Sequence, residues 1–216
     1  MWYSGGFVVS SIADSLFVQE NATGLTSRCR RQLRYTNIYD GGANGNTMLV
    51  KELTICHSTC VLAPADCVWR HITEVDIASF RHPAYLSALG IPKPLRAEIR
   101  EAGAGGVRVA YFDNDKRFLQ EITFWKPPEE YSFTFRADPG FRVGHFLDLA
   151  EGPFRMKSGT YTLARIEDGV SLRLTSRYEL RGVSGLCLSL PIRLSLGLFQ
   201  HYLLRGIKAN AERENA

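Results

Sequence analysis

"SGTYTLARIEDGVSLRLTSRYEL", residues 158–180, carries the clearest secondary-structure signal in the chain. Two runs rich in β-branched and apolar residues flank Asp168-Gly169, a pair that suits the left-handed positions of a tight turn. The second run alternates apolar and polar side chains from Leu172 to Tyr178, which is typical of a strand with one buried face. The stretch therefore predicts a β-hairpin with strands over 159–166 and 170–180.

Other strands are expected upstream of this hairpin. β-branched runs and two-residue alternation mark them, and turns or breakers such as Pro127-Pro128 separate them. The expected strands cover residues 48–61, 95–100, 107–111, 117–125 and 131–135. Because the strands follow one another instead of alternating with helices, the sequence indicates an α+β fold whose curved antiparallel sheet has about seven strands.

Two short helices are expected after the first strand. Pro64 and Asp66 suit the first turn of a helix, and Val68 and Ile72 continue it at helical spacing. A second short helix is expected over 77–80, where it ends before a proline because a residue that precedes proline is biased away from the helical region.

The chain closes with a long amphipathic helix, expected over 192–213. Its apolar stripe consists of Leu196, Phe199, Leu203 and Ile207. Strands with one buried face need an apolar partner, so we expect the curved sheet to wrap around this helix.

The composition is that of a soluble globular protein, with 216 residues of which 45% are hydrophobic and 22% charged. Residues 1–46 show little apolar periodicity and end in a run rich in glycine and asparagine, which indicates a poorly ordered N-terminal extension before a domain over 47–216. The net charge of +4 is mild, and the arginines within 28–34 occur without a nucleic-acid-binding motif. We therefore expect no nucleic-acid partner.

The five cysteines are irregularly spaced, which favours reduced thiols and a cytoplasmic location. Cys56 and Cys60 fall in one expected strand, where they would lie about 13 Å apart at about 3.3 Å per residue. That separation excludes a shared metal ion or a disulfide, so we expect no metal site there. Because the sequence shows no secretion signal, membrane-spanning run or cofactor-binding motif, we expect neither an integral membrane segment nor a cofactor.

Five stretches follow one another in the chain: "APADCVWRHITEV" (63–75), "GIPKP" (90–94), "FLQEITFW" (118–125), the hairpin at 158–180, and "HYLLRGIKANAE" (201–212). Their order and their motifs resemble the helix-grip superfamily abbreviated SRPBCC, which includes START-like lipid carriers, pollen-allergen-like proteins and polyketide cyclases/dehydrases. The resemblance covers about residues 50–213. Members of this subtype often carry membrane helices before the domain, whereas residues 1–46 contain none.

The resemblance implies a cavity between the sheet and the C-terminal helix that holds an apolar or amphipathic small molecule, and it leaves the oligomeric state open. The candidate ligand contacts are the aromatic, aliphatic and cationic residues expected around such a cavity, with core packing as the alternative role for the aromatic members. These candidates are Trp69, Tyr85, Ile91, Arg108, Tyr111, Trp125, Phe133, Tyr178, Phe199 and Leu203.

An enzyme would need an acid/base group inside the cavity. Simple alternation puts Glu121 on the same strand face as Trp125. If that face is concave, Glu121 is a partly buried carboxylate with a raised pKa or an arginine partner such as Arg108. In the opposite arrangement, Ile122 and Phe124 face inward and Glu121 lies on the surface. Both arrangements stay open.

Three functions are consistent with the sequence. Binding or carriage of a hydrophobic small molecule (a lipid, a polyketide-like or an aromatic compound) leads, because no catalytic constellation stands out. The second is a polyketide cyclase or dehydratase that uses Glu121 as its acid/base. The third is a protein-interaction module with a collapsed cavity, which a cavity smaller than about 300 Å³ would favour.

Overall fold

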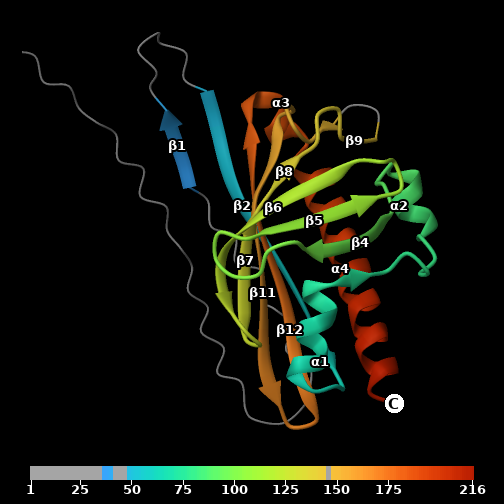
Figure 1. Ribbon diagram of the computed structural model, residues 1–216. Helices are drawn as coiled ribbons and strands as arrows, with labels where there is room; N and C mark the ends of the chain where they lie inside the picture. The colour runs from blue at the N-terminus through green and yellow to red at the C-terminus, as the bar shows by residue number, and fades with distance from the viewer. Residues whose placement is uncertain (1–35, 41–47, 145–146) are drawn as a thin grey trace, which may run out of the picture.

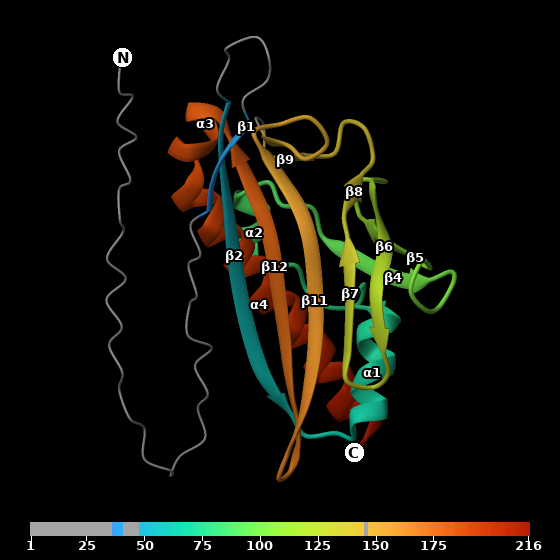
Figure 2. The same ribbon diagram turned by 90° about the vertical axis from the view of Figure 1, so that its left-hand side faces the viewer.

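A computed structural model describes residues 36–40, 48–144 and 147–216, and its main feature is a curled antiparallel sheet around one long helix (Figures 1 and 2). Across the sheet, the strand order is β1 (Thr36–Asp40), β2 (Met48–Val61), β12 (Gly169–Arg181), β11 (Phe154–Ile166), β7 (Glu130–Thr134), β6 (Arg117–Lys126), β5 (Val107–Phe112), β4 (Pro94–Ile99) and β3 (Val75–Asp76). Two-residue strands complete the set: β8 (Arg136–Ala137) pairs with β6, and β9 (Arg142–Val143) pairs with β10 (Leu147–Asp148).

The expected antiparallel sheet and its central hairpin are confirmed. Eight strands have five or more residues: β1 and the seven strands β2, β4, β5, β6, β7, β11 and β12. In the hairpin, Ile166 pairs with Gly169 and Leu163 with Leu172, so the turn lies at the position that the Asp-Gly pair predicts. Figure 2 shows β2, β12 and β11 as long neighbouring strands with α4 behind them.

Four helices accompany the sheet in the described part of the chain: α1 (Ala65–Thr73), α2 (Ala84–Ala88), α3 (Gly182–Cys187) and α4 (Ser189–Glu214). The prediction of a helix over 77–80 is wrong. Ile77 instead continues the edge of the sheet, with its N–H bonded to Leu95 O at 2.9 Å. The second helix begins directly after Pro83, because proline fixes a backbone conformation that suits the start of a helix better than its end.

Two of the three register shifts in the described sheet are β-bulges in β6 and β11. The register of β6 against β7 shifts between Ile122 and Phe124, and that of β11 against β12 shifts between Met156 and Ser158. A bulge adds an unpaired residue, bends its strand and changes which side chains face inward. The sheet therefore curls, and the inward face of β6 and of β11 changes parity along the strand.

Polar contacts fix the C-terminal end of α4. Glu212 accepts a hydrogen bond from the backbone N–H of Leu62 at 2.8 Å, which ties the helix to the end of β2. Glu214 accepts from His71 at 2.7 Å and pairs with Arg70 at 2.5 Å, both on α1. Hydrogen bonds from His71 and then Arg70 lower the pKa of the Glu214 carboxyl.

The predicted N-terminal extension falls mostly outside the described residues. Of residues 1–46, the structure describes Thr36–Asp40, which form β1 and pair antiparallel with β2. The boundary at residue 47 remains a prediction. In the described ranges, no helix has both the length and the apolar composition that crossing a bilayer requires.

Two glycines of α4 offer a matched pair of substitutions. A methyl group on Gly206 would lie 2.7 Å from Cγ2 of Ile77, which is fully buried. A methyl group on Gly197 would come no closer than 3.4 Å to His57 or Ile55. We expect Gly206→Ala to lower the free energy of unfolding by about 1 kcal/mol, since overpacking costs about 1–3 kcal/mol and alanine recovers about 1 kcal/mol of helix propensity.

Gly197→Ala should be neutral or stabilising by up to about 1 kcal/mol, because it gains the same propensity without the clash. Urea unfolding followed by circular dichroism measures both variants against the parent chain. Equal effects of the two substitutions would contradict the close packing of α4 on Ile77.

Candidate functional site

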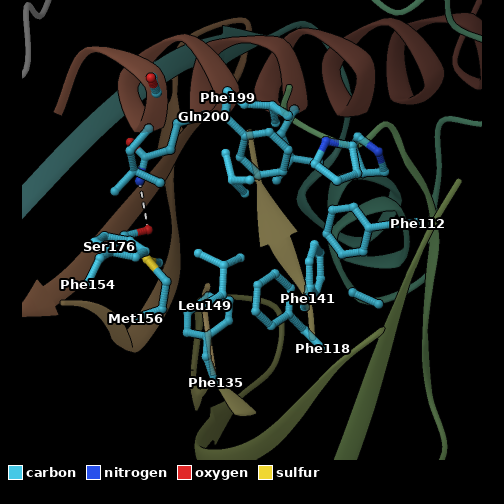
Figure 3. Close-up of a pocket in the computed structure, with 18 of the residues that line it drawn as sticks. Phe112, Phe118, Phe135, Phe141, Leu149, Phe154, Met156, Ser176, Phe199 and Gln200 are labelled. Atoms are coloured by element: carbon cyan, nitrogen blue, oxygen red, sulfur yellow. Dashed lines mark hydrogen bonds between the residues drawn. The ribbon is translucent and has the colours of Figure 1, made fainter. Parts of the chain in front are cut away.

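A cavity of about 300 Å³ lies between the concave face of the sheet and the N-terminal half of α4 (Figure 3). Strands β4, β5, β6, β7, β11 and β12 contribute side chains to it, and most of the lining residues are apolar. The volume is at the lower end of the range of about 300–1,000 Å³ that small-molecule sites occupy. The expected cavity between sheet and helix is therefore present and open.

Four phenylalanines form one wall of the cavity: Phe112, Phe118, Phe135 and Phe141. Phe141 lies 5.0 Å from Phe112 and 4.7 Å from Phe118, and Phe118 lies 5.6 Å from Phe135, all between ring centroids. Most of these contacts are edge-to-face, the geometry that the ring quadrupoles favour. The wall offers ring faces and edges to an apolar ligand.

Helix α4 supplies the opposite wall through Leu196, Phe199 and Leu203. These side chains belong to the apolar stripe of the helix, yet each is only half-buried. They pack against the core and also line the cavity, so an apolar ligand would remove their remaining area from water at about 25 cal/mol per Å².

Two buried polar groups meet where α4 crosses β2 and β12. Gln200 is 1% exposed, and its Nε2 donates to Ser176 Oγ at 2.7 Å, a bond drawn in Figure 3. His57 Nδ1 donates to Gln200 Oε1 at 2.7 Å. The chain of bonds fixes the orientation of the amide, because both of its atoms have partners.

A second polar pair lies on β5 and β6. Arg108 is 4% exposed and Gln120 is also 4% exposed, and both line the cavity. Arg108 Nη1 donates to Gln120 Oε1 at 2.5 Å. Among the described residues, Arg108 is the one buried charged residue of the cavity lining.

An aromatic cluster separates the cavity from α1. Trp69 of α1 lies 5.0 Å from Trp125 and 5.6 Å from Tyr131, and Tyr131 stacks on Tyr161, which lines the cavity. Tyr131 and Tyr161 are fully buried, and burial raises the pKa of both phenols, that of Tyr161 to about 12. The cluster closes this side of the cavity with rings that stay neutral.

Half of the candidate ligand contacts line the cavity: Ile91, Arg108, Phe133, Phe199 and Leu203. They come from separate segments of the chain, and the fold brings them together as expected. Their contact with a ligand remains a prediction.

The other candidates lie elsewhere. Trp69 and Trp125 belong to the aromatic cluster, and Tyr178 packs against Phe154 at 5.5 Å in the core outside the cavity. Tyr111 donates from its hydroxyl to Glu98 at 2.8 Å on the outer face of the sheet, and Tyr85 is 45% exposed. For these five, the geometry supports packing or surface roles.

Glu121 lies on the outer face of β6 and does not line the cavity. The expectation that it shares a face with Trp125 is wrong, because the bulge between Ile122 and Phe124 breaks the alternation. Before the bulge, Gln120 and Ile122 are buried, and after it Trp125 turns inward while Phe124 is 46% exposed. The position of Glu121 therefore gives no support to an acid/base role inside the cavity.

Sequence reasoning missed several lining residues. Phe112 lies two and four residues after the inward-facing Ala110 and Arg108, so strand alternation contained a usable signal for it. Gln200 lies one turn after Leu196 on α4 and was detectable by helical spacing. Phe141 belongs to a turn before β9, where no periodic pattern marks it.

The cysteine-rich strand agrees with its predicted geometry. Cys60 is exposed and Cys56 half-buried, while His57 points to α4 from the other face of β2. In the described ranges, one group has donor atoms close enough for a metal ion: Cys67, His71 and Glu214, within 4.8 Å of one another. Burial raises the pKa of the Cys67 thiol, which disfavours the thiolate that a metal needs, and Glu214 is already engaged by α1. We assign no metal site there.

The cavity lining combines apolar side chains with a few hydrogen-bonding groups. In the part of the chain that the structure describes, neither a carboxylate nor a histidine lines it. Its amides, hydroxyls and guanidinium groups can orient a ligand by hydrogen bonds, but none of them exchanges a proton readily near neutral pH.

The buried phenol of Tyr161 predicts an alkaline loss of stability. An unfolded tyrosine has a pKa of about 10, whereas the pKa of the folded phenol is about 12. The folded state therefore keeps its proton to a higher pH than the unfolded state. The stability that the neutral phenol contributes is complete below about pH 10 and is lost as the pH rises toward 12. Urea unfolding between about pH 9 and about pH 11.5 should show a steeper decline for the parent than for Tyr161→Phe, with a difference on the order of 1–2 kcal/mol. Parallel declines would contradict the burial of this phenol.

Comparison with known proteins shows which solved structures share this geometry. No protein-family model and no curated protein sequence matches the chain. Among solved structures, a protein of Thermus thermophilus is similar with a TM-score of 0.51 and 18% identity over 76% of this chain and 99% of that one. Ara h 8.0201 is similar with a TM-score of 0.50 and 16% identity over 74% of this chain and 97% of the other.

The Zhui aromatase/cyclase from a Streptomyces species is also similar, with a TM-score of 0.47 and 18% identity over 76% of this chain and 96% of that one. The curled sheet, the long closing helix and the cavity between them agree with the motifs in the sequence. The chain thus has the helix-grip fold.

Proposed function

We propose that the protein binds and carries a hydrophobic small molecule in the cavity between the sheet and α4. The observation that carries the proposal is the cavity itself: about 300 Å³, lined by phenylalanines and leucines, with a few fixed polar groups. Such a lining is typical of small-molecule sites, in which apolar contacts give affinity and sparse polar groups give orientation. Lipid, polyketide-like and aromatic molecules share the required chemistry.

The two alternatives have less support. A cyclase or dehydratase that uses Glu121 would need this carboxylate in the cavity, and it lies on the outer face of β6. A protein-interaction module with a collapsed cavity would need side chains in the space that the phenylalanine wall and α4 leave free.

The first test is native mass spectrometry of the purified full chain, together with titration of a neutral fluorescent naphthylamine. We expect a co-purified small molecule or saturable binding of the probe with one site per chain. A chain that is folded by circular dichroism, carries no co-purified compound and fails to bind the probe would contradict the proposal.

A cavity-filling variant makes the test specific. Ala110 faces the cavity from β5, so Ala110→Phe should place a ring in the cavity and weaken probe binding at least tenfold, about 1.4 kcal/mol. Ala102→Phe introduces the same ring at an exposed position between β4 and β5, and this control should bind the probe like the parent. If both variants bind equally well, the probe binds outside the cavity.

A further inference from the structure

Arg108 is a buried cation in a cavity that is otherwise mostly apolar. It is 4% exposed, faces the cavity from β5, and lies 5.7 Å from the ring centroid of Phe133. Removing a charge from water costs several kcal/mol unless a counter-charge or hydrogen bonds compensate. The buried guanidinium therefore needs hydrogen-bond partners or a counter-charge that offset the free-energy cost of its burial.

The partners of Arg108 are all neutral. Its Nη1 donates to Gln120 Oε1 at 2.5 Å, its Nη2 to Ile72 O at 3.2 Å, and its Nε to Thr73 O at 3.4 Å. The two carbonyls end α1, where the helix dipole gives a partial negative charge of about one half. Among the described residues, no carboxylate forms an ion pair with Arg108, so its charge is only partly compensated.

The guanidinium also has unused donors. It carries five N–H groups, and the three hydrogen bonds use one each, which leaves two on the terminal nitrogens. A guanidinium fork matches the two oxygens of a carboxylate, and such charge-assisted bonds are among the strongest in proteins. The other charged lining residue is Arg96, so both lining charges in the described residues are positive.

We infer that the ligand is an amphipathic organic acid, whose carboxylate binds Arg108 and whose apolar body lies against the phenylalanine wall. This inference rests on the proposed function and specifies the class of ligand. Gln120 holds one Nη1 hydrogen and thereby orients the fork. The dipole of α1 holds the guanidinium in the absence of ligand, and the acid supplies the missing counter-charge.

The test compares pairs of ligands that share one apolar body. Decanoic acid and decanol form one pair, and 2-naphthoic acid and 2-naphthalenemethanol form the other. Each competes with the neutral naphthylamine probe for the full chain at neutral pH. At least one acid should displace the probe at a concentration tenfold or more below that of its matching alcohol.

Substitution of the guanidinium tests its role. Arg108→Met keeps the length of the side chain without the charge, and it should remove the preference for the acid while alcohol and probe still bind. Arg108→Lys should keep part of the preference, because the charge remains but the planar fork is lost. Arg100→Met is the matched control: this arginine is exposed between β4 and β5 and does not line the cavity, so its replacement should leave the preference unchanged.

The outcomes separate the two proposals. If acids and alcohols displace the probe equally from the parent chain, the organic-acid inference is overturned and the carrier proposal stands. If Arg108→Met keeps the preference, Arg108 is not the anion site. If neither ligands nor probe bind the folded parent, the carrier proposal itself fails.

A purely structural role for Arg108 as the partner of α1 is also distinguishable. If Arg108→Met does not fold, the parent chain and Arg108→Lys still decide, because a structural role predicts no preference for the acid in either. In the parent, the preference should fall as the pH drops through the ligand's own carboxyl pKa of about 4–5, while displacement by the alcohol stays constant over that range. A pH-independent preference would overturn the inference.

Discussion

The concave face of the sheet is wider than the helix that covers it. Seven strands at a spacing of about 4.8 Å span about 29 Å, whereas a helix with its side chains is about 10–12 Å across. One helix cannot fill that face, so other groups must cover the rest. The aromatic cluster around Tyr131 fills the side next to α1, and the space that neither it nor α4 fills is the cavity.

The position of α1 explains how the charge of Arg108 is stabilised in the interior. Helix α1 packs Trp69 into the aromatic cluster, and its last carbonyls, from Ile72 and Thr73, point to Arg108. A short helix thus contributes both apolar packing and a local negative potential. The same helix therefore closes the cavity with an aromatic ring and stabilises the charge of Arg108 in the cavity lining.

The architecture was largely predictable because strand and turn patterns are local. The hairpin with Asp168-Gly169, the strand over 48–61 and the closing helix α4 all lie where their periodicity indicates.

The site was only partly predictable. The bulge between Ile122 and Phe124 reverses the face of β6, and no residue type announces it in the sequence. Phe141 reaches the cavity from a turn, where its position follows from packing on other rings. Sequence periodicity tells which side of a strand is buried, but not whether a packed side chain or empty space lies opposite.

Helix α4 is held unequally at its two ends. Glu212 and Glu214 fasten the C-terminal end to β2 and α1, whereas the N-terminal half meets a cavity on one side and carries Leu190, Leu194 and Leu198 exposed on the other. In that half, Gln200 is the polar anchor: its hydrogen bonds to His57 and Ser176 hold the helix across β2 and β12 beside the cavity.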